Sequence, residues 1–189
     1  MRTILRDILI TLLLVAVIFG GLQITFDRYV VDGSSMNPTL HDGQRLLINK
    51  LVYNFHEPQR GDVIIFSTPD RGQKHYIKRI IGLPGESVEI KDGVVYIHQP
   101  GGSVFALDEP YVTQPATQDF TGDIILENEY FFLGDNRNNS EDSRSGWRLS
   151  REDIAGNAWL SIWPPSQWGV VNNYPLQEQI ENAAMASTP

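Results

Sequence analysis

The chain has 189 residues, and its 15 lysines and arginines against 23 aspartates and glutamates give a formal net charge of -8. A chain of this length holds one medium-sized domain with an appendage. Its acidic balance argues against nucleic acid as a partner, because phosphate binding needs a basic face. There is no cysteine, which excludes disulfides, thiolate metal sites and a cysteine nucleophile. Covalent catalysis would have to use oxygen or nitrogen, and we expect neither a metal nor a cofactor.

Residues 8–26 form an uncharged and largely apolar run near the N-terminus. A helix of that length spans about 28 Å, close to the hydrocarbon thickness of a bilayer. Arg2 and Arg6 precede the run and Asp27 follows it. Because positive charge favours the cytoplasmic side, we expect residues 1–7 in the cytoplasm and the rest of the chain outside.

Two other interpretations of this run are a cleaved signal peptide and a buried core helix. Cleavage requires small residues in an Ala-x-Ala arrangement, and the run ends instead in Leu22-Gln23-Ile24-Thr25-Phe26. A core helix would show a polar face, which this segment lacks. The sequence therefore favours a retained transmembrane anchor over residues 8–26.

The body of the chain, residues 27–175, shows short β-branched and aromatic runs between Gly, Pro, Asn and Asp, as antiparallel strands do. Asp92-Gly93 is a strong signal for a two-residue hairpin turn. We therefore predict a mostly β fold. Residues 99–128 have weak patterning and indicate an inserted lobe or long loops, and residues 176–189 are a polar tail, either a short helix or disordered. The best strand candidates are residues 45–50, 63–66, 76–81, 88–90, 94–97, 129–133 and 158–163.

Ser34 and Ser35 lie between Gly33 and Pro38, soon after the anchor. A glycine before them permits an unusual backbone angle and a proline stiffens the exit, which can hold a serine exposed. Serines beside glycine and proline are also ordinary turn residues. The pattern alone does not distinguish a nucleophile from a turn.

A serine nucleophile needs a base that takes its proton. A Ser/His/Asp triad stays open, with His41, His56, His75 or His98 as the histidine. Lys78 is the other candidate, because strand alternation places it on one face with apolar neighbours, where desolvation would lower its proton affinity. A solvated lysine on an edge strand is the alternative interpretation.

Four segments, in this order, resemble the signature motifs of the type I signal peptidase family. Residues 33–40 (GSSMNPTL) resemble its nucleophile motif, and residues 76–86 (YIKRIIGLPGE) resemble its general-base motif. Residues 60–66 (RGDVIIF) and 134–144 (GDNRNNSEDSR) resemble two further motifs. With the anchor, the resemblance covers most of the chain from Ile8 to about Trp163. It implies a membrane-bound serine endopeptidase with an antiparallel β catalytic domain.

The resemblance implies that Ser35 is the acylating nucleophile and Lys78 the neutral general base. Ser140 matches the hydroxyl that hydrogen-bonds and orients the lysine amine. A carboxylate in that place would raise the lysine pKa, whereas a hydroxyl orients the amine without adding charge. The charged residues that the resemblance places as a supporting shell of ion pairs are Arg79, Asp135, Asp142 and Arg144; for each of them, a surface charge in a turn is the alternative.

One position departs from the family pattern. Many members carry a serine two residues before the nucleophile, and its hydroxyl joins the nucleophile's backbone N–H in the oxyanion hole; here that position is Gly33. A water, Ser34 or a backbone N–H near Gly33 would have to replace it. We rank the backbone N–H first, because glycine allows close approach.

By the same resemblance, shallow apolar pockets accept small side chains at the first and third positions before the cut. The implied partners are signal peptides of exported preproteins, membrane lipid and the export machinery. The membrane would be the plasma membrane or an internal energy-converting one. The residues implied to line the pockets are Tyr29, Val31, Met36, Leu40, Ile65, Tyr76 and Ile77.

Two rival functions remain at this point. Self-cleaving repressors share the Ser/Lys chemistry but work in the cytosol, so they should lack the anchor. A membrane-tethered β-domain that binds peptides without cutting them would not need Ser35, Lys78 and Ser140 together.

Overall fold

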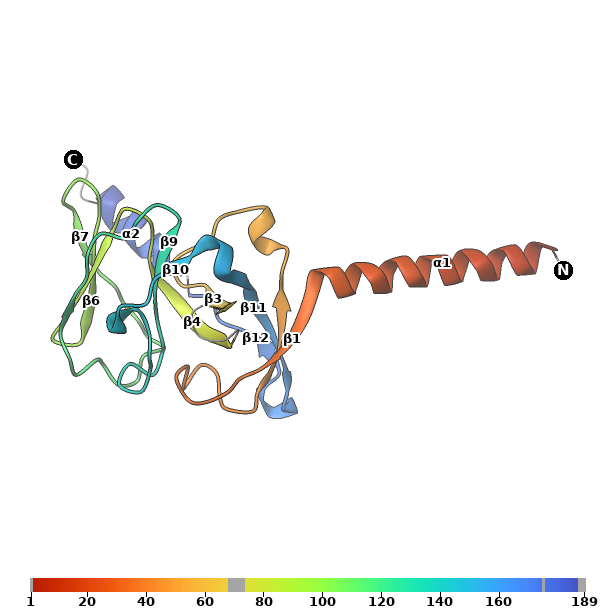
Figure 1. Cartoon of the computed structure of the whole chain (residues 1–189), viewed down its shortest axis with the longest axis horizontal. Coiled ribbons are helices and arrows are strands. Elements are labelled where there is room, and N and C mark those ends of the chain that lie inside the picture. The colour runs from red at the N-terminus through yellow and green to blue at the C-terminus, as the bar shows by residue number, and fades with distance from the viewer. Residues whose placement is uncertain (1, 68–73, 175, 187–189) are drawn as a thin grey trace.

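A computed structural model of the chain describes residues 2–67, 74–174 and 176–186. Helix α1 (Arg2–Thr25) projects from a β-rich body (Figure 1). Its apolar side chains from Ile4 onward are exposed. The stretch Ile4–Thr25 is long and apolar enough to cross a membrane. The helix begins six residues before the expected anchor and ends one residue earlier, because Phe26 is already the first residue of strand β1 (Phe26–Val30).

The main sheet has eight strands in the order β1-β2-β11-β3-β4-β9-β10, with β12 paired to β11, and all its pairs are antiparallel. Short 3-10 turns at Val52–Asn54, Ser143–Ser145, Arg151–Asp153 and Pro165–Gln167 connect or flank the strands. The remaining strands of this sheet are β2 (Arg45–Asn49), β3 (Val63–Ser67), β4 (His75–Gly82), β9 (Glu129–Leu133), β10 (Leu149–Ser150), β11 (Ile154–Trp163) and β12 (Gly169–Val170).

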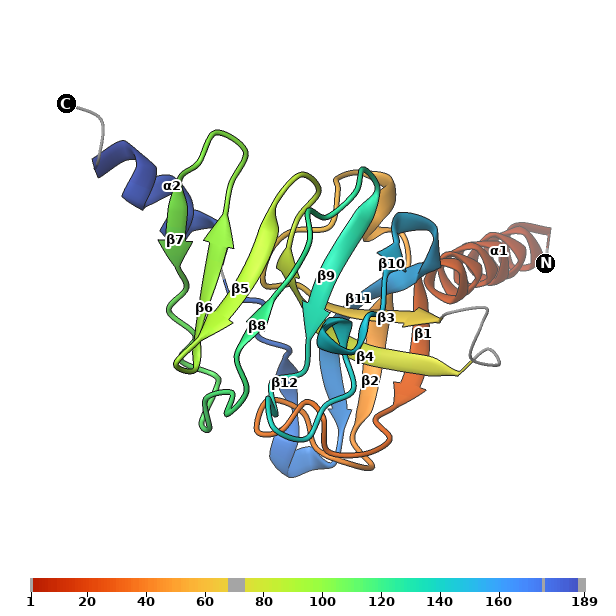
Figure 2. The ribbon, with the colours of Figure 1, turned by 60° about the vertical axis from the view of Figure 1, so that its left-hand side comes forward.

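A second, four-stranded sheet has the order β7-β6-β5-β8 and lies at the end of the molecule far from α1 (Figure 2). Asp92 and Gly93 both have positive φ angles, as the expected two-residue hairpin turn requires. The strands of this sheet are β5 (Ser87–Lys91), β6 (Val94–His98), β7 (Val104–Ala106) and β8 (Phe120–Thr121).

The mostly β prediction is confirmed, and each of the seven expected strands is present. The segment 99–128 does not form a lobe by itself: β7 and β8 from this segment pair with the β5–β6 hairpin. We call residues 87–121, which carry the second sheet, the lobe. Sequence patterning missed β1 and the two- and three-residue strands, because so few residues show no periodicity.

The polar tail is an ordered helix, α2 (Leu176–Ala186). Leu176 is fully buried and Ile180 nearly so, and both belong to the hydrophobic cluster between the lobe and strands β4 and β9. The four-residue spacing of these two apolar side chains places them on one face of the helix. Of the two alternatives for the tail, the short helix is present. The two apolar positions that the description as a polar tail overlooked attach this helix to the body.

Strand β4 packs against apolar side chains on both faces. On one face, Ile77 contacts a cluster that contains Val63 and Ile65. On the other face, Tyr76 and Ile80 belong to an aromatic cluster around Phe66, Phe132 and Trp147. Lys78 lies between Tyr76 and Ile80 on this second face, as the alternation of the strand predicted.

Candidate active site

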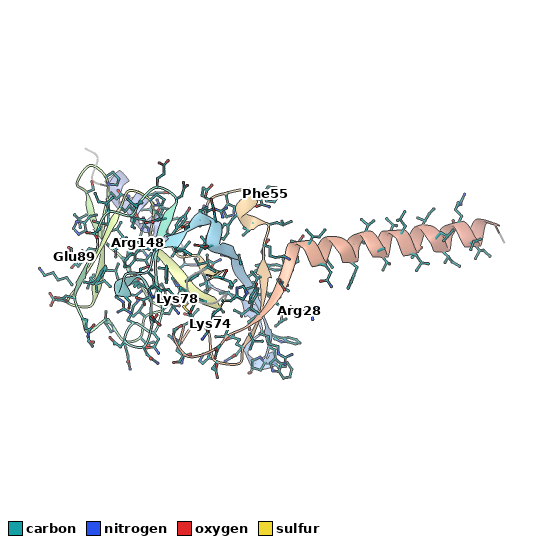
Figure 3. The ribbon with its side chains drawn as sticks, in the orientation of Figure 1. Arg28, Phe55, Lys74, Lys78, Glu89 and Arg148 are labelled. Carbon is teal, nitrogen blue, oxygen red and sulfur yellow. The ribbon has the colours of Figure 1, made fainter. Side chains whose placement is uncertain are left out.

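Lys78 and Ser35 meet at the edge of a cleft beside strand β4. Lys78 lies opposite Ile64 of β3, and only 4% of the residue is exposed. Figure 3 shows its place within the β-rich body. Ser35 lies in the turn of residues 33–40 between β1 and β2, which we call the nucleophile turn. The Lys78 Nζ and Ser35 Oγ atoms are 2.6 Å apart and hydrogen-bonded. A base and a hydroxyl nucleophile at this distance can exchange a proton directly.

Burial lowers the pKa of Lys78 to about 8, because desolvation disfavours the ammonium form. The carboxylates of Asp142, Asp135 and Glu141 act in the opposite direction, and the charge of Lys74 adds to the lowering. Desolvation is the largest of these effects. At pH 7 a pKa of about 8 leaves roughly one in ten Lys78 side chains as the neutral amine, which is the form that can accept a proton from Ser35.

The loop of residues 134–144 holds the backbone of the nucleophile turn. The Asn136 amide N–H donates to the Ser35 carbonyl at 3.0 Å, and its side-chain amide donates to the Ser34 carbonyl at 3.1 Å. Asn139 donates to the Ser34 hydroxyl at 2.9 Å. At Gly134, an added Cβ would overlap the Ser35 carbonyl oxygen and the Ser140 side chain. Sequence reasoning missed these roles, because only the resemblance of the whole motif pointed to the loop.

Two ion pairs stabilise this arrangement from behind. Arg79 donates to both carboxylate oxygens of Asp135, at 2.9 and 2.8 Å, and both side chains are buried. Arg144 binds the Asp142 carboxylate at 2.8 and 2.9 Å. One Asp142 oxygen also accepts the Gly134 N–H at 3.1 Å. The four charged residues placed in a supporting shell thus form two pairs around the loop 134–144.

Ser140 differs from the expectation. Its hydroxyl is buried and makes no hydrogen bond within the described part of the chain. The amine of Lys78 is bonded to Ser35 instead, and the Ser140 side chain lies against Gly134. The expected hydrogen bond between Ser140 and Lys78 is therefore not present in this structure.

The second oxyanion donor also differs from the expectation. Gly33 has φ +91°, in the region that favours glycine, but its N–H donates to Asp42 Oδ1 at 2.7 Å. A backbone N–H near Gly33 was ranked first, and the N–H of Gly33 itself is already occupied. The Ser35 N–H makes no backbone hydrogen bond to any described residue and faces no such competition. The Ser34 N–H, the Ser34 hydroxyl and a water remain as candidates for the second donor.

A cleft of about 170 Å³ begins at Ser35 and Lys78. Five of the seven residues expected to line it do so: Tyr29, Val31, Met36, Tyr76 and Ile77.

The other two, Leu40 and Ile65, do not line this cleft. Both are buried in the core cluster of β2, β3 and β11, and Leu40 borders a separate, larger hollow of about 470 Å³ near β12. Their expected role in the pocket was wrong, because an apolar residue in a motif fits a core position equally well.

In the described part of the chain, the histidines show no bonded contact with Ser35. His75 lines the cleft and packs edge-on against the ring of Tyr29 at 4.8 Å, and His98 pairs with Glu89 in the second sheet. None of the four histidines is hydrogen-bonded to Ser35 within the described residues. In the same residues, no group of three or more His, Asp or Glu side chains could hold a metal ion.

Comparison with known proteins gives a consistent result. Residues 2–163 match the family described as signal peptidase, peptidase S26. A probable signal peptidase I of Synechocystis sp. is 38% identical over 177 residues, which cover 87% of this chain and 86% of that protein. Signal peptidase I T of Bacillus subtilis is 42% identical over 150 residues, or 74% of this chain and 75% of that protein. A solved signal peptidase I of Enterococcus faecalis is 36% identical, covering 53% of this chain and 96% of that chain, with a TM-score of 0.46.

Proposed function

Since this chain belongs to the signal peptidase family, peptidase S26, a family of serine endopeptidases, we propose that Ser35 and Lys78 carry out its cleavage of signal peptides. The observation that carries this proposal is the 2.6 Å contact between Ser35 Oγ and Lys78 Nζ. The burial that lowers the pKa of Lys78 to about 8 supports a base role for the amine.

In the proposed mechanism, the neutral Lys78 amine takes the Ser35 proton while Oγ attacks the carbonyl carbon of the scissile peptide bond. The Ser35 N–H donates to the oxyanion that forms. The Lys78 ammonium then gives its proton to the leaving amine, the C–N bond breaks, and an ester to Ser35 remains. Lys78 next takes a proton from a water, whose oxygen attacks the ester carbon. The ester C–O bond then breaks, Lys78 returns the proton to Ser35 Oγ, and the signal peptide leaves with a new carboxyl group.

We place the residues before the cut in the cleft beside the pair. Its volume of about 170 Å³ and its apolar lining by Val31, Met36 and Ile77 suit small side chains. Strand alternation in an extended peptide sends the first and third residues before the cut to the same side. Small residues at those two positions are therefore the specificity that this cleft supports.

We place α1 across the membrane, with residues 1–7 in the cytoplasm and the catalytic domain on the other side, as the flanking charges favour. Trp159, Trp163 and Trp168 are exposed, and Phe26, directly after α1, stacks on Trp159 at 5.1 Å. Tryptophan favours the boundary between lipid and water. The body would then lie on the lipid surface where the export machinery delivers preproteins.

The test is cleavage of a preprotein and of a synthetic Ala-x-Ala peptide by the purified chain in detergent. Ser35→Ala should abolish both reactions. Ser34→Ala is the matched control for the choice of serine: it leaves the Ser35 hydroxyl in place and removes the hydrogen bond from Asn139, so cleavage should persist, lowered only by the share that a Ser34 hydroxyl contributes to the oxyanion hole. An inactive Ser34→Ala enzyme together with an active Ser35→Ala enzyme would show that Ser34, and not Ser35, is the nucleophile.

The rival peptide-binding function makes a different prediction in the same experiment. A domain that only binds peptides would retain the Ala-x-Ala peptide without producing fragments, in the wild type as in Ser35→Ala. The cytosolic repressor function does not account for the exposed apolar side chains of α1.

A further inference from the structure

We propose that the lobe positions the nucleophile, through Glu109 and Tyr111, which hold the two arginines that fix the loop 134–144 and the nucleophile turn. This inference rests on the proposed role of Ser35. Glu109 and Tyr111 lie between β7 and β8 and do not line the cleft beside Ser35. They act through other residues, and we therefore call them positioning residues.

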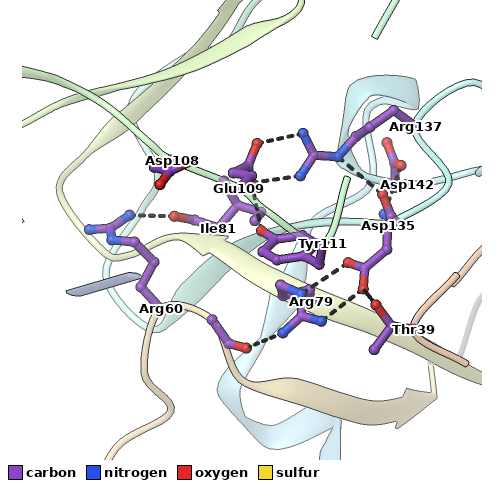
Figure 4. Close-up of polar contacts among 12 residues, drawn as sticks. Thr39, Arg60, Arg79, Ile81, Asp108, Glu109, Tyr111, Asp135, Arg137 and Asp142 are labelled. Atoms are coloured by element: carbon purple, nitrogen blue, oxygen red, sulfur yellow. Dashed lines mark hydrogen bonds and ion pairs between the residues drawn. The ribbon is translucent and has the colours of Figure 1, made fainter. Parts of the chain in front are cut away.

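The first connection runs from Glu109 to Arg137. The Arg137 guanidinium donates to both carboxylate oxygens of Glu109, at 2.7 and 2.6 Å (Figure 4). The side chains are 1% and 8% exposed, respectively. A buried arginine needs such a partner, because an uncompensated charge in the interior is strongly destabilising. Glu109 thereby fixes where the Arg137 side chain lies.

Arg137 in turn braces the loop 134–144 at two points. Its Nε donates to the Gly134 carbonyl at 3.2 Å, and its own carbonyl accepts from Arg144 at 2.6 Å. Between these points, Asn136 donates to the Ser35 carbonyl. A shift of Arg137 would therefore move Gly134 and Asn136, the two residues that lie against the Ser35 carbonyl.

The second connection runs through Tyr111. Its hydroxyl donates to Glu109 at 2.6 Å, and its ring lies 4.1 Å from the Arg79 guanidinium carbon. Arg79 holds Asp135, and Asp135 accepts a 2.5 Å hydrogen bond from Thr39, four residues after Ser35 (Figure 4). The lobe thus reaches both ends of the nucleophile turn, through Asn136 at one end and Thr39 at the other.

Positional control of this kind should affect the chemical step more than binding. Small displacements of a reacting group can lower a rate by about 100-fold, because the near-attack geometry is lost. The cleft is lined by residues such as Tyr29, Val31 and Met36, and no described residue of the lobe lines it. The structure therefore predicts a lower kcat with little change in KM when the Glu109 contact is lost.

The experiment measures kcat and KM of the full-length chain in detergent with an Ala-x-Ala peptide. Glu109→Gln should lower kcat about 10- to 100-fold and leave KM within about threefold. The double variant Glu109→Gln/Arg137→Gln removes both buried charges, so it should regain stability; kcat should stay low, because the Arg137 contact with Gly134 is gone. A folded double variant with wild-type kcat would overturn the proposal.

Glu86→Gln is the matched control. Glu86 binds Arg60 through both carboxylate oxygens at 2.6 and 2.8 Å, with side chains 6% and 0% exposed, but this pair braces the β4–β5 connection and not the loop 134–144. Glu86→Gln should destabilise the protein as Glu109→Gln does, with kcat per folded molecule within about twofold of the wild type. Equal losses of kcat in the two variants would also overturn the proposal.

Hydrogen exchange at the Asn136 amide gives a readout that does not depend on cleavage. This N–H donates to the Ser35 carbonyl, so it should exchange faster in Glu109→Gln and in Tyr111→Phe, but not in Glu86→Gln. If the wild type did not cleave the peptide, the proposed function would fail, and the exchange data would still decide whether the lobe positions the turn. If the Asn136 amide of a folded Glu109→Gln protein exchanged as slowly as in the wild type, the proposal that the lobe positions the nucleophile turn would be rejected.

Discussion

In the proposed mechanism, burial of the Lys78 amine makes the activity depend on pH, because the neutral amine is the form that takes the Ser35 proton. The pKa of Lys78 is lowered to about 8. Cleavage of the peptide should therefore be slow at pH 6, increase through about pH 8 and level off above it. The midpoint of this increase lies well below the pKa of a free lysine, which is about 10.4. The pH profile of kcat/KM measures this ionisation in the free enzyme.

Lys78→Arg tests the same role without a pH change. Arginine keeps the positive charge but does not lose its proton in this range. Both Lys78→Arg and Lys78→Ala should therefore be inactive in peptide cleavage while remaining folded by circular dichroism. Substantial cleavage by a folded Lys78→Arg protein would show that Lys78 acts by charge alone, and attention would move to His75, which lines the same cleft.

Gly134 is a second residue at which a small change should have a large effect. A Cβ there would overlap the Ser35 carbonyl and the Ser140 side chain. We expect Gly134→Ala to lower kcat by about 100-fold or more, because the nucleophile would be displaced. Adding Ser140→Gly should not restore activity, since the Ser35 carbonyl is backbone and still overlaps. Near wild-type kcat in Gly134→Ala would contradict the tight contact.

At the scale of single residues, the sequence predicted which residues lie together in the candidate site. It predicted less well which hydrogen bonds and contacts they make with one another. Ser35 and Lys78 could be paired because each is embedded in a recognisable motif. The roles of Asn136 and Gly134 depend on backbone atoms of another segment, which side-chain chemistry does not reveal. The position of Ser140 and the Asp42 contact of Gly33 are set by the path of two loops, which residue types alone do not determine.

Among the secondary-structure elements, α2 offers a stability prediction. Leu176 is fully buried between the lobe and the main sheet. Leu176→Ala should lower the free energy of unfolding by about 2–5 kcal/mol, because it removes buried methyl groups and leaves a cavity. Glu178→Ala, on the exposed face of the same helix, should change it by no more than about 0.5 kcal/mol. Equal denaturation midpoints for the two variants would show that α2 does not contribute to the core.

The long strands were predictable and the short elements were not. Strands β3 and β9 each carry apolar residues at four of five positions, and Asp62 precedes β3 while Gly134 follows β9. In contrast, β8 and β12 have two residues each and form only because neighbouring strands offer free backbone groups. Their existence depends on tertiary pairing, which local patterning does not contain.

For the whole molecule, the separate placement of α1 predicts that anchor and catalysis can be uncoupled. Within the described residues, the side chains of α1 from Ile4 to Leu22 are mostly exposed, and the partner of β1 is β2. A chain beginning at Phe26 should cleave a soluble peptide with kcat within about threefold of the full-length enzyme. It should process a preprotein embedded in vesicles much more slowly, because encounter then depends on diffusion from solution.

Replacing exposed tryptophans in this shortened chain would separate the two contributions to encounter. Trp163→Ser with Trp168→Ser should weaken its binding to lipid vesicles without altering peptide cleavage. Equal processing of the embedded preprotein by the shortened and full-length chains would show that the anchor has no part in encounter.

The junction between α1 and β1 has a mechanical consequence. The helix ends at Thr25 and the strand begins at Phe26, while the Thr25 carbonyl accepts a 2.9 Å hydrogen bond from the Lys50 N–H at the end of β2. In the proposed membrane orientation, a helix that runs into a strand without a linker would fix the distance between the bilayer and Ser35. We therefore expect the position of the cut to depend on the distance of the scissile bond from the lipid as well as on the substrate's side chains.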